Sequence, residues 1–246
     1  MKKISKSELN IIKDFIVIDN ENTKVVFTTA SEGKSYNRNT EEGINNLQAL
    51  KKEFHVSRVI YLKQVHSDII VSYTGEKEEE VISYEGDAII TNVKDTIVGV
   101  FTADCTPVII VDDKRKVLAA VHSGWKGTFK SITKKTIEKL VSNYNVKAEE
   151  LKVYIGPHIR QCCYEISNEL KEKFILEKGL EEDKLFKGRN LSMEECILKD
   201  LRECGIRDEN INSINLCTHC EKDIKLFSYR GSNGDYGRLF AFTLIK

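Results

Sequence analysis

Short runs of apolar and β-branched residues recur along the chain, with polar residues between them. Runs of this length and composition are typical of strands, and several are apolar on successive positions, as in strands buried on both faces. We therefore expect strands at residues 25–28, 58–62, 69–73, 87–91, 96–103, 108–111, 117–121, 151–155, 214–216 and 239–245.

Fewer segments repeat apolar residues at the period of a helix. The apolar positions between 129 and 144 fall on one helical face, and Thr128 is placed to cap the start of that helix. Ser192 and Glu195 form an S-x-x-E capping box before a second apolar face, and Gly205 is the expected stop. Weaker helical patterns lie at 45–54 and 167–174.

Many strands with a minority of unevenly spaced helices favour an α/β or α+β fold with mixed sheets. No Pro-, Gly- or Ser-rich linker and no internal repeat divides the 246 residues, so we expect one domain over 1–246 with a large core. The charge run at 76–80 is interpreted as a solvated turn between strands.

Charge and cysteine content exclude several classes of partner. The 38 basic and 38 acidic residues cancel, so the basic excess of a nucleic-acid-binding protein is missing. No apolar run follows the basic N-terminal residues or approaches the ~20 residues that span a bilayer. Seven cysteines, an odd number, favour a reducing compartment over a disulfide framework. We therefore expect a cytoplasmic protein without nucleic-acid or membrane partners.

Three expected strands end in side chains that can bind a metal: His66, Cys105 and His122. Two imidazoles and a thiolate suit Zn²⁺, and three protein ligands leave a fourth position for water or substrate. The same residues have a second interpretation, in which Cys105 is a nucleophile, either histidine is its base, and Asp104 orients the base. A purely structural role is also consistent with each residue, because the spacing matches no zinc-finger signature.

Cys217 and Cys220 form a C-x-x-C, which is half of a structural zinc site or a redox pair. Two further ligands could come only from the adjacent cysteines at 162–163 or from Cys196 and Cys204. Because no second C-x-x-C exists, the sequence favours reduced, structural thiols.

Two cations are candidates for anion binding. The Gly-rich turn at 124–128 lacks the spacing of a phosphate-binding P-loop, but its backbone N–H groups and Lys126 suit an anion. Arg230 is either a surface ion-pair donor or an anion-binding fork.

Eight short motifs follow one another in order. They are K-Q-V-H at 63–66, G-D-A at 86–88, T-A-D-C at 102–105, H-S-G-W-K-G at 122–127, I-G-P at 155–157, C-Y-E at 163–165, F-S-Y-R at 227–230 and G-R at 237–238. In this order they resemble the YfiH-like family, also called the multicopper polyphenol oxidase or laccase-domain family. The resemblance covers nearly the whole chain, from about residue 25 to the end.

The resemblance implies a four-layer α/β/β/α fold with mixed sheets and a zinc site made of His66, Cys105 and His122. It also implies a purine nucleoside phosphorylase that acts on adenosine, inosine and S-methyl-5'-thioadenosine and that deaminates adenosine. The expected partners are therefore a nucleoside and phosphate, with the protein a monomer or homodimer. On this view Asp104 is the acid–base group or the hydrogen-bond partner of a ligand histidine.

Lys126, Arg230 and Gln64 are our candidate phosphate and substrate contacts for this activity. The sequence also departs from the family pattern. Ala30 follows F-T-T where the family often has Arg, and His158 follows I-G-P where Cys is common. His158 is therefore a candidate extra ligand, although a surface or supporting position is favoured.

Two other activities are described for similar proteins. One is a cysteine amidohydrolase that removes misincorporated serine from a peptidoglycan precursor, which would use Cys105 as nucleophile. The other is a copper-dependent polyphenol oxidase, with copper in place of zinc. Multicopper oxidases need about ten histidines in His-x-His pairs. This chain has five histidines and no such pair, which counts against the oxidase.

Overall fold

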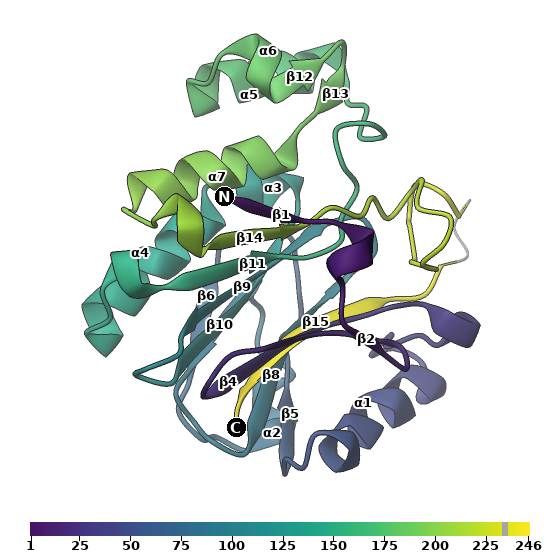
Figure 1. Cartoon of the computed structure of the whole chain (residues 1–246), viewed down its shortest axis with the longest axis vertical. Helices are drawn as coiled ribbons and strands as arrows, with labels where there is room; N and C mark the ends of the chain where they lie inside the picture. The colour runs from purple at the N-terminus through teal and green to yellow at the C-terminus, as the bar shows by residue number, and fades with distance from the viewer. Residues whose placement is uncertain (233–235) are drawn as a thin grey trace.

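A computed structural model of the chain describes residues 1–232 and 236–246. Two mixed β-sheets pack face to face, and helices cover the outer face of each (Figure 1). The four-layer α/β/β/α architecture that the resemblance implies is confirmed.

Seven strands form the first sheet, and their order brings distant parts of the chain together. The order is β1 (Lys2–Ile4), β14 (Ile211–Ile214), β11 (Lys152–Ile155), β9 (Thr106–Asp112), β10 (Val117–Ser123), β7 (Ala88–Thr91) and β6 (Ile70–Tyr73). The pairs β1–β14, β14–β11 and β7–β6 are parallel, and the other pairs are antiparallel. β1, at the purple end of the chain, therefore lies beside β14, near its other end (Figure 1).

Six strands form the second sheet. The order is β2 (Ile11–Ile12), β3 (Phe15–Asp19), β4 (Thr23–Thr28), β15 (Leu239–Ile245), β8 (Thr96–Thr102) and β5 (Arg58–Ile60). All its pairs are antiparallel except β5–β8. The helices are α1 (Glu41–Glu53), α2 (Glu78–Val81), α3 (Trp125–Phe129), α4 (Ile132–Tyr144), α5 (Asn168–Lys178), α6 (Glu182–Leu185) and α7 (Met193–Glu203). A short hairpin, β12 (Phe186–Lys187) and β13 (Asn190–Leu191), precedes α7.

The central strands are apolar on both faces because each face packs on another layer. In β8, Val98 and Val100 face the other sheet, whereas Ile97 and Phe101 belong to the cluster that includes Leu47 of α1. The central strands of the first sheet divide in the same way between the inter-sheet core and the face covered by α4 and α7. Full burial of both faces therefore explains the continuous apolar runs.

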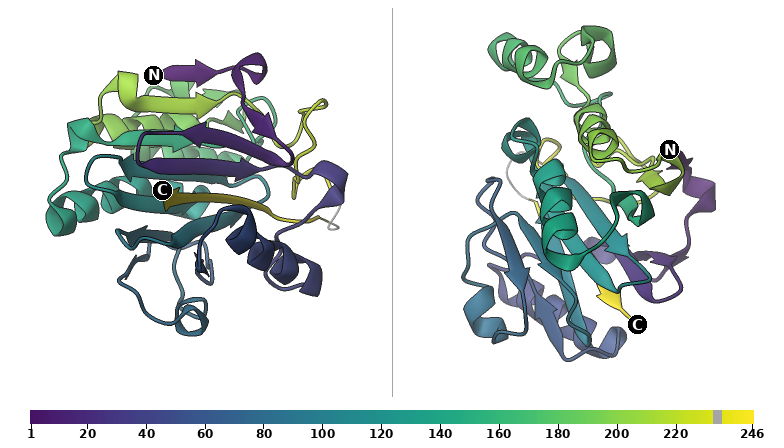
Figure 2. Two further views of the ribbon diagram at one scale, coloured as in Figure 1. Left: turned by 60° about the horizontal axis from the view of Figure 1, so that its bottom comes forward. Right: turned by 90° about the vertical axis from the view of Figure 1, so that its left-hand side faces the viewer.

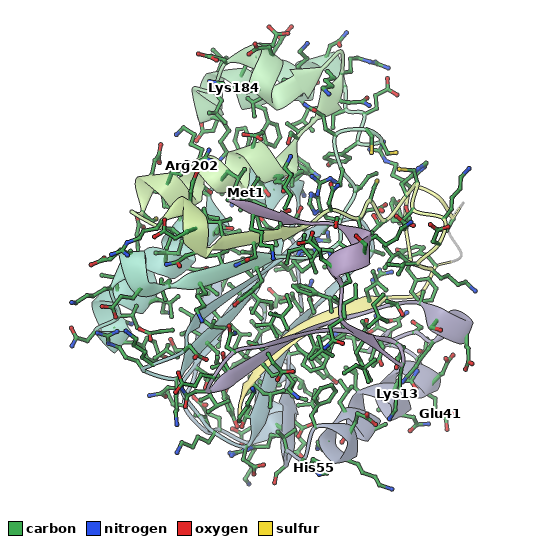
Figure 3. All side chains as sticks on the ribbon, in the orientation of Figure 1. Met1, Lys13, Glu41, His55, Lys184 and Arg202 are labelled. Carbon is green, nitrogen blue, oxygen red and sulfur yellow. The ribbon has the colours of Figure 1, made fainter. Side chains whose placement is uncertain are left out.

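Residues 165–191, with α5, α6 and the β12–β13 hairpin, form an excursion that lies to one side of the four layers (Figure 2). Its apolar side chains, among them Phe174 and Leu185, form a cluster with Met193 and Cys196 of α7. Phe129 of α3 contacts this cluster, and its ring lies 5.2 Å from that of Phe174, edge to face. Lys184 lies on the excursion and Arg202 on α7, both at the outer surface (Figure 3).

Several local expectations are wrong. The helix expected from residue 129 is split by Ser131, which has φ = +56°, so Thr128 lies inside α3 and pairs with the Ser123 hydroxyl at 2.7 Å instead of capping α4. The charge run at 76–80 includes the short helix α2. β14 ends at Ile214, where the expected strand began, and the N-terminal strands β1 to β3 were not expected.

The expected start and stop of α7 are confirmed. The Ser192 hydroxyl accepts a hydrogen bond from the Glu195 N–H and so caps α7, and Gly205 follows that helix with φ = +83°. None of the helices in the described ranges, 1–232 and 236–246, has the length and apolar character needed to cross a membrane.

Candidate metal and substrate site

His66, Cys105 and His122 come together although they are far apart in the sequence. Their metal-binding atoms all lie within 4.8 Å of one another. His66 is in the loop after β5, Cys105 lies between β8 and β9, and His122 is near the end of β10. The three elements come from both sheets, so the packing of one sheet on the other assembles this cluster.

A break between β8 and β9 allows Cys105 to join the histidines. Asp104 has φ = +90°, a conformation that Asp tolerates better than most residues, and the chain leaves the second sheet there for the first. The strands expected at 96–103 and 108–111 are therefore separate, as β8 and β9. Pro107 does not cause this separation, because Pro107 lies within β9 and pairs with His122.

The buried carboxylate of Asp87 orients both histidines. It accepts hydrogen bonds from the backbone N–H groups of Val65, His66 and Ser67, and from the Ser67 hydroxyl. Its other contact is Nδ1 of His122, at 2.8 Å, which leaves Nε2 free to bind a metal. Burial acts to raise the pKa of Asp87, but hydrogen bonds from His122 and Ser67 outweigh it and lower that pKa.

Close packing around Gly124 limits what this position can hold. A Cβ atom there would lie 3.1 Å from the His66 ring, 3.2 Å from Cys105 Sγ and 3.4 Å from the His122 ring. A side chain at residue 124 would therefore press on His66 and Cys105 and come into contact with His122.

Cys105 and His122 shift each other's pKa in opposite directions. Burial raises the pKa of the Cys105 thiol, but the charges and hydrogen bonds of His122 and His66 outweigh burial and lower it to about 6. Burial lowers the pKa of His122, whereas Cys105 and Asp87 raise it to about 9. Between these pH values the protein groups form a thiolate–imidazolium pair.

The donor set fits a metal ion. Cys105 Sγ and His66 Nε2 are 4.0 Å apart, close to the separation of about 3.5 Å between sulfur and nitrogen ligands of tetrahedral zinc. The two imidazole rings stand edge to face, with centroids 4.9 Å apart. Two histidines and one cysteine suit zinc and are also found at copper centres, so the geometry supports a metal site without fixing the metal.

The three candidate ligands open into a cavity of about 670 Å³. Its lining combines cationic and aromatic side chains, which suits a ligand that has both an anionic and a planar part. The cations are Arg38, Arg230 and Arg238, and the aromatic residues are Phe101, Trp125, Tyr164, Tyr229 and Tyr236.

Asp104 lines this cavity and also holds the C-terminal loop in place. Its carboxylate accepts the Thr218 hydroxyl and the Arg230 N–H, each at 2.7 Å. The Arg230 guanidinium donates to the Glu165 carbonyl and lies over the Tyr164 ring. The sequence offered Asp104 as partner of a ligand histidine, but the carboxylate that contacts His122 belongs to Asp87.

Gln64 and Lys126 differ from the simple contacts expected of them. The Gln64 amide lines the cavity but pairs with both the N–H and the carbonyl of Phe101, so it ties the His66 loop to β8. Lys126 is exposed, is absent from the cavity lining, and lies over the Trp125 ring. The structure therefore does not bring Lys126 into the site.

His158 lies outside the cluster. It is buried, not on the surface; its Nδ1 contacts the Gly156 carbonyl, and burial lowers its pKa to about 4. Three charged groups in the site were not named as candidates from the sequence: Asp87, Arg38 and Arg238, the last of which lies in the G-R motif. The G-D-A motif was a signal for Asp87, whereas no motif marks Arg38.

Comparisons with known proteins identify the family and the fold of the chain. A family model described as "Multi-copper polyphenol oxidoreductase laccase" matches residues 23–246. The chain belongs to this YfiH-like family. The crystal structure of YfiH from Bacillus licheniformis shares the fold with a TM-score of 0.87 at 23% identity, covering 96% of this chain and 97% of that one. The crystal structure of YlmD from Geobacillus stearothermophilus shares the fold with a TM-score of 0.85 at 21% identity, covering 96% of this chain and 98% of that one.

Two relatives are more similar in sequence to this chain than these two solved structures are. A protein of Clostridium acetobutylicum named purine nucleoside phosphorylase is 43% identical over 246 residues, which is 100% of this chain and 99% of that protein. One of Aquifex aeolicus with the same name is 32% identical and covers 78% of this chain and 86% of its own length. The similarity to the first extends over the whole chain.

The lowered pKa of Cys105 gives a testable pH dependence in metal-stripped protein. We expect its alkylation by iodoacetamide, followed by peptide mass spectrometry, to be half-maximal near pH 6, because the thiolate is the reacting form. Cys204 is the internal control, since burial raises its pKa to about 11 and its rate should still be rising at pH 9. A Cys105 midpoint near its ordinary value of 9.0 would contradict the thiolate–imidazolium pair.

The role of Asp87 predicts weaker metal binding when its charge is removed. Asp87→Asn should lower zinc affinity by about ten- to a hundredfold, because both histidines lose the carboxylate that orients them. The measurement is competition with a zinc-chelating dye. Asp113→Asn is the matched control, since Asp113 is also buried but bonds to Asn22 and Thr23, away from the site. Equal affinities for the two variants would refute the role.

Proposed function

We propose that this chain is a zinc-dependent purine nucleoside phosphorylase acting on adenosine, inosine and S-methyl-5'-thioadenosine. The observation that carries the proposal is a single cavity that combines the His66–Cys105–His122 cluster with three arginines and several aromatic rings. The 43% identity to a protein named purine nucleoside phosphorylase supports the same conclusion.

Phosphorolysis places clear demands on such a cavity. A phosphate oxygen forms a bond to the ribose C1' while the C1'–N9 bond breaks. The electron pair of the C1'–N9 bond leaves with the purine, which takes up a proton. The site must therefore hold an anion beside a planar base and stabilise the charge that develops on that base.

The arginines are our candidates for phosphate binding. A guanidinium offers a planar fork of donors that matches phosphate oxygens. The chain lacks the arginine that the family often has after Thr29, and the fully buried Ala30 stands there instead. Arg38, which lines the cavity, supplies a guanidinium from another position. Arg230 is held by the Glu165 carbonyl and Tyr164, so little ordering is needed when phosphate binds.

The base and its proton are assigned to other cavity residues. Trp125, Tyr164 and Tyr229 present aromatic surface suited to a purine ring. Among the lining residues that the structure describes, Asp104 is the one with a carboxylate, and we assign it the acid–base role. Zinc bound to His66, Cys105 and His122 would supply Lewis-acid chemistry in the same cavity. Adenosine deamination, with water as co-substrate in place of phosphate, is included in the proposal.

One observation favours a second candidate function. Cys105, His122 and Asp87 form a thiolate, an imidazolium and an orienting carboxylate, which is the arrangement of a cysteine hydrolase. The alternative is therefore a cysteine amidohydrolase that removes misincorporated serine from a peptidoglycan precursor.

Product analysis distinguishes the two functions. We expect purified protein to release hypoxanthine and ribose 1-phosphate from inosine only when phosphate is present. The protein should contain zinc rather than copper. The His66→Ala variant should be at least a hundredfold slower in this reaction. Adenosine without phosphate should give inosine. Serine release from the seryl precursor, with no base release from any nucleoside, would refute the phosphorylase and favour the amidohydrolase.

The placement of cations predicts which residue binds phosphate. Arg230→Ala should raise KM for phosphate by about ten- to a hundredfold, the effect expected from losing a charge-assisted hydrogen bond of about 1.5–3 kcal/mol. Lys126→Ala is the matched control and should leave that KM unchanged, because Lys126 does not line the cavity. The assignment fails if Lys126→Ala has the larger effect.

A further inference from the structure

A second group of cysteines lies outside the active cavity. Cys162 and Cys163 come from the loop after β11, and Cys217 and Cys220 from the loop after β14. β11 and β14 are adjacent and parallel, so both loops leave the sheet at the same edge. The four Sγ atoms all lie within 4.8 Å of one another. The sequence favoured reduced, structural thiols, because Cys162 and Cys163 do not form a second C-x-x-C. Only the structure shows that these two residues lie beside Cys217 and Cys220.

The spacing of the sulfur atoms is that of metal ligands. Cys162 Sγ and Cys220 Sγ are 3.7 Å apart. Two thiolates on one tetrahedral zinc ion are separated by about 3.8 Å, given zinc–sulfur bonds of about 2.3 Å. A disulfide would need about 2.05 Å. All seven cysteines of the chain are free thiols in the structure.

The C-x-x-C segment has the form of a metal-binding turn. The Glu221 N–H donates to the Cys217 carbonyl at 3.0 Å, which closes residues 217–220 into a tight turn. The Arg160 N–H donates to Cys217 Sγ at 3.4 Å, a contact that stabilises a thiolate. Cys217 is buried whereas Cys162 and Cys220 are exposed, so the group is anchored in the fold and open to an entering ion.

We propose that Cys162, Cys163, Cys217 and Cys220 form a second metal site that binds zinc. Four thiolates fill a tetrahedral coordination shell, so no position remains for water or substrate and the site is structural. It would join the loops after β11 and β14, which otherwise meet through the contacts of His158 and Arg160 with Cys217 and Thr218.

This site would also stiffen the active cavity. Thr218, inside the C-x-x-C, donates its hydroxyl to Asp104. Tyr164, directly after Cys163, lines the cavity and lies under the Arg230 guanidinium. Binding of one ion to both loops therefore fixes two walls of the cavity, although the site takes no part in the reaction. The inference does not depend on the proposed function.

Metal counting tests the proposal. The variants are made in a Cys105→Ser background, which removes a ligand of the first cluster, and zinc is measured by mass spectrometry in protein purified without chelators. We expect Cys163→Ser and Cys220→Ser each to lose one zinc per chain relative to the background, and Cys204→Ser, a cysteine outside the group, to lose none. Cobalt loading of the background protein should give a strong thiolate-to-cobalt absorption band that both ligand variants lack.

A measurement on the unaltered chain covers the case in which a variant fails to fold. Alkylation of the exposed Cys162 and Cys220 should be at least tenfold slower in the purified protein than after addition of a zinc chelator. The proposal is overturned if both cysteines react at the same rate with and without chelator. It is also overturned if zinc content is equal in all variants. A protein mass two hydrogens below that of the fully reduced chain, which would show a disulfide, overturns it as well.

Discussion

The candidate site depends on one buried charge, the carboxylate of Asp87. Its two oxygens accept three backbone N–H groups, one hydroxyl and one imidazole, so the cost of burying the charge is offset by hydrogen bonds. The loop that carries His66 has no regular backbone pairing of its own at this point and takes its shape around that carboxylate. The positive φ of His66, +56°, is one result. A single side chain thus sets the positions of two of the three candidate ligands.

The third ligand is positioned by the way the sheets pack. β8 and β9 belong to different sheets, and the turn at Asp104 that joins them carries Cys105. Apolar side chains from both sheets fill the space between them, which fixes where this turn lies relative to β10 and His122. The cluster is therefore built on rigid elements, whereas much of the cavity lining comes from loops and from the excursion at 165–191.

Most of the fold and the ligand cluster could be predicted, and the failures have physical causes. The central strands were found because burial on both faces gives continuous apolar runs, whereas short edge strands such as β1 and β2 carry no such signal. The candidate ligands were identified from motifs. Asp87 was missed because its importance lies in contacts across space. Lys126 was expected in the site but does not line the cavity, because sequence does not show which way α3 points its side chains. The cysteines at 162–163 were weighed as partners of Cys217 and Cys220 but not favoured, because the sequence does not show that the two pairs lie close in space.

The excursion has a consequence for how such enzymes can diversify. Ile166, Ser167 and Leu170 of this segment line the cavity, yet the segment packs in an apolar cluster with α3 and α7 and supplies none of the candidate metal ligands. Insertions or exchanges within it would reshape one wall while leaving the two sheets and the Asp87 network intact. Substrate preference and metal chemistry can therefore evolve separately, and a chimera that exchanges only this segment between relatives is a practical route to altered selectivity.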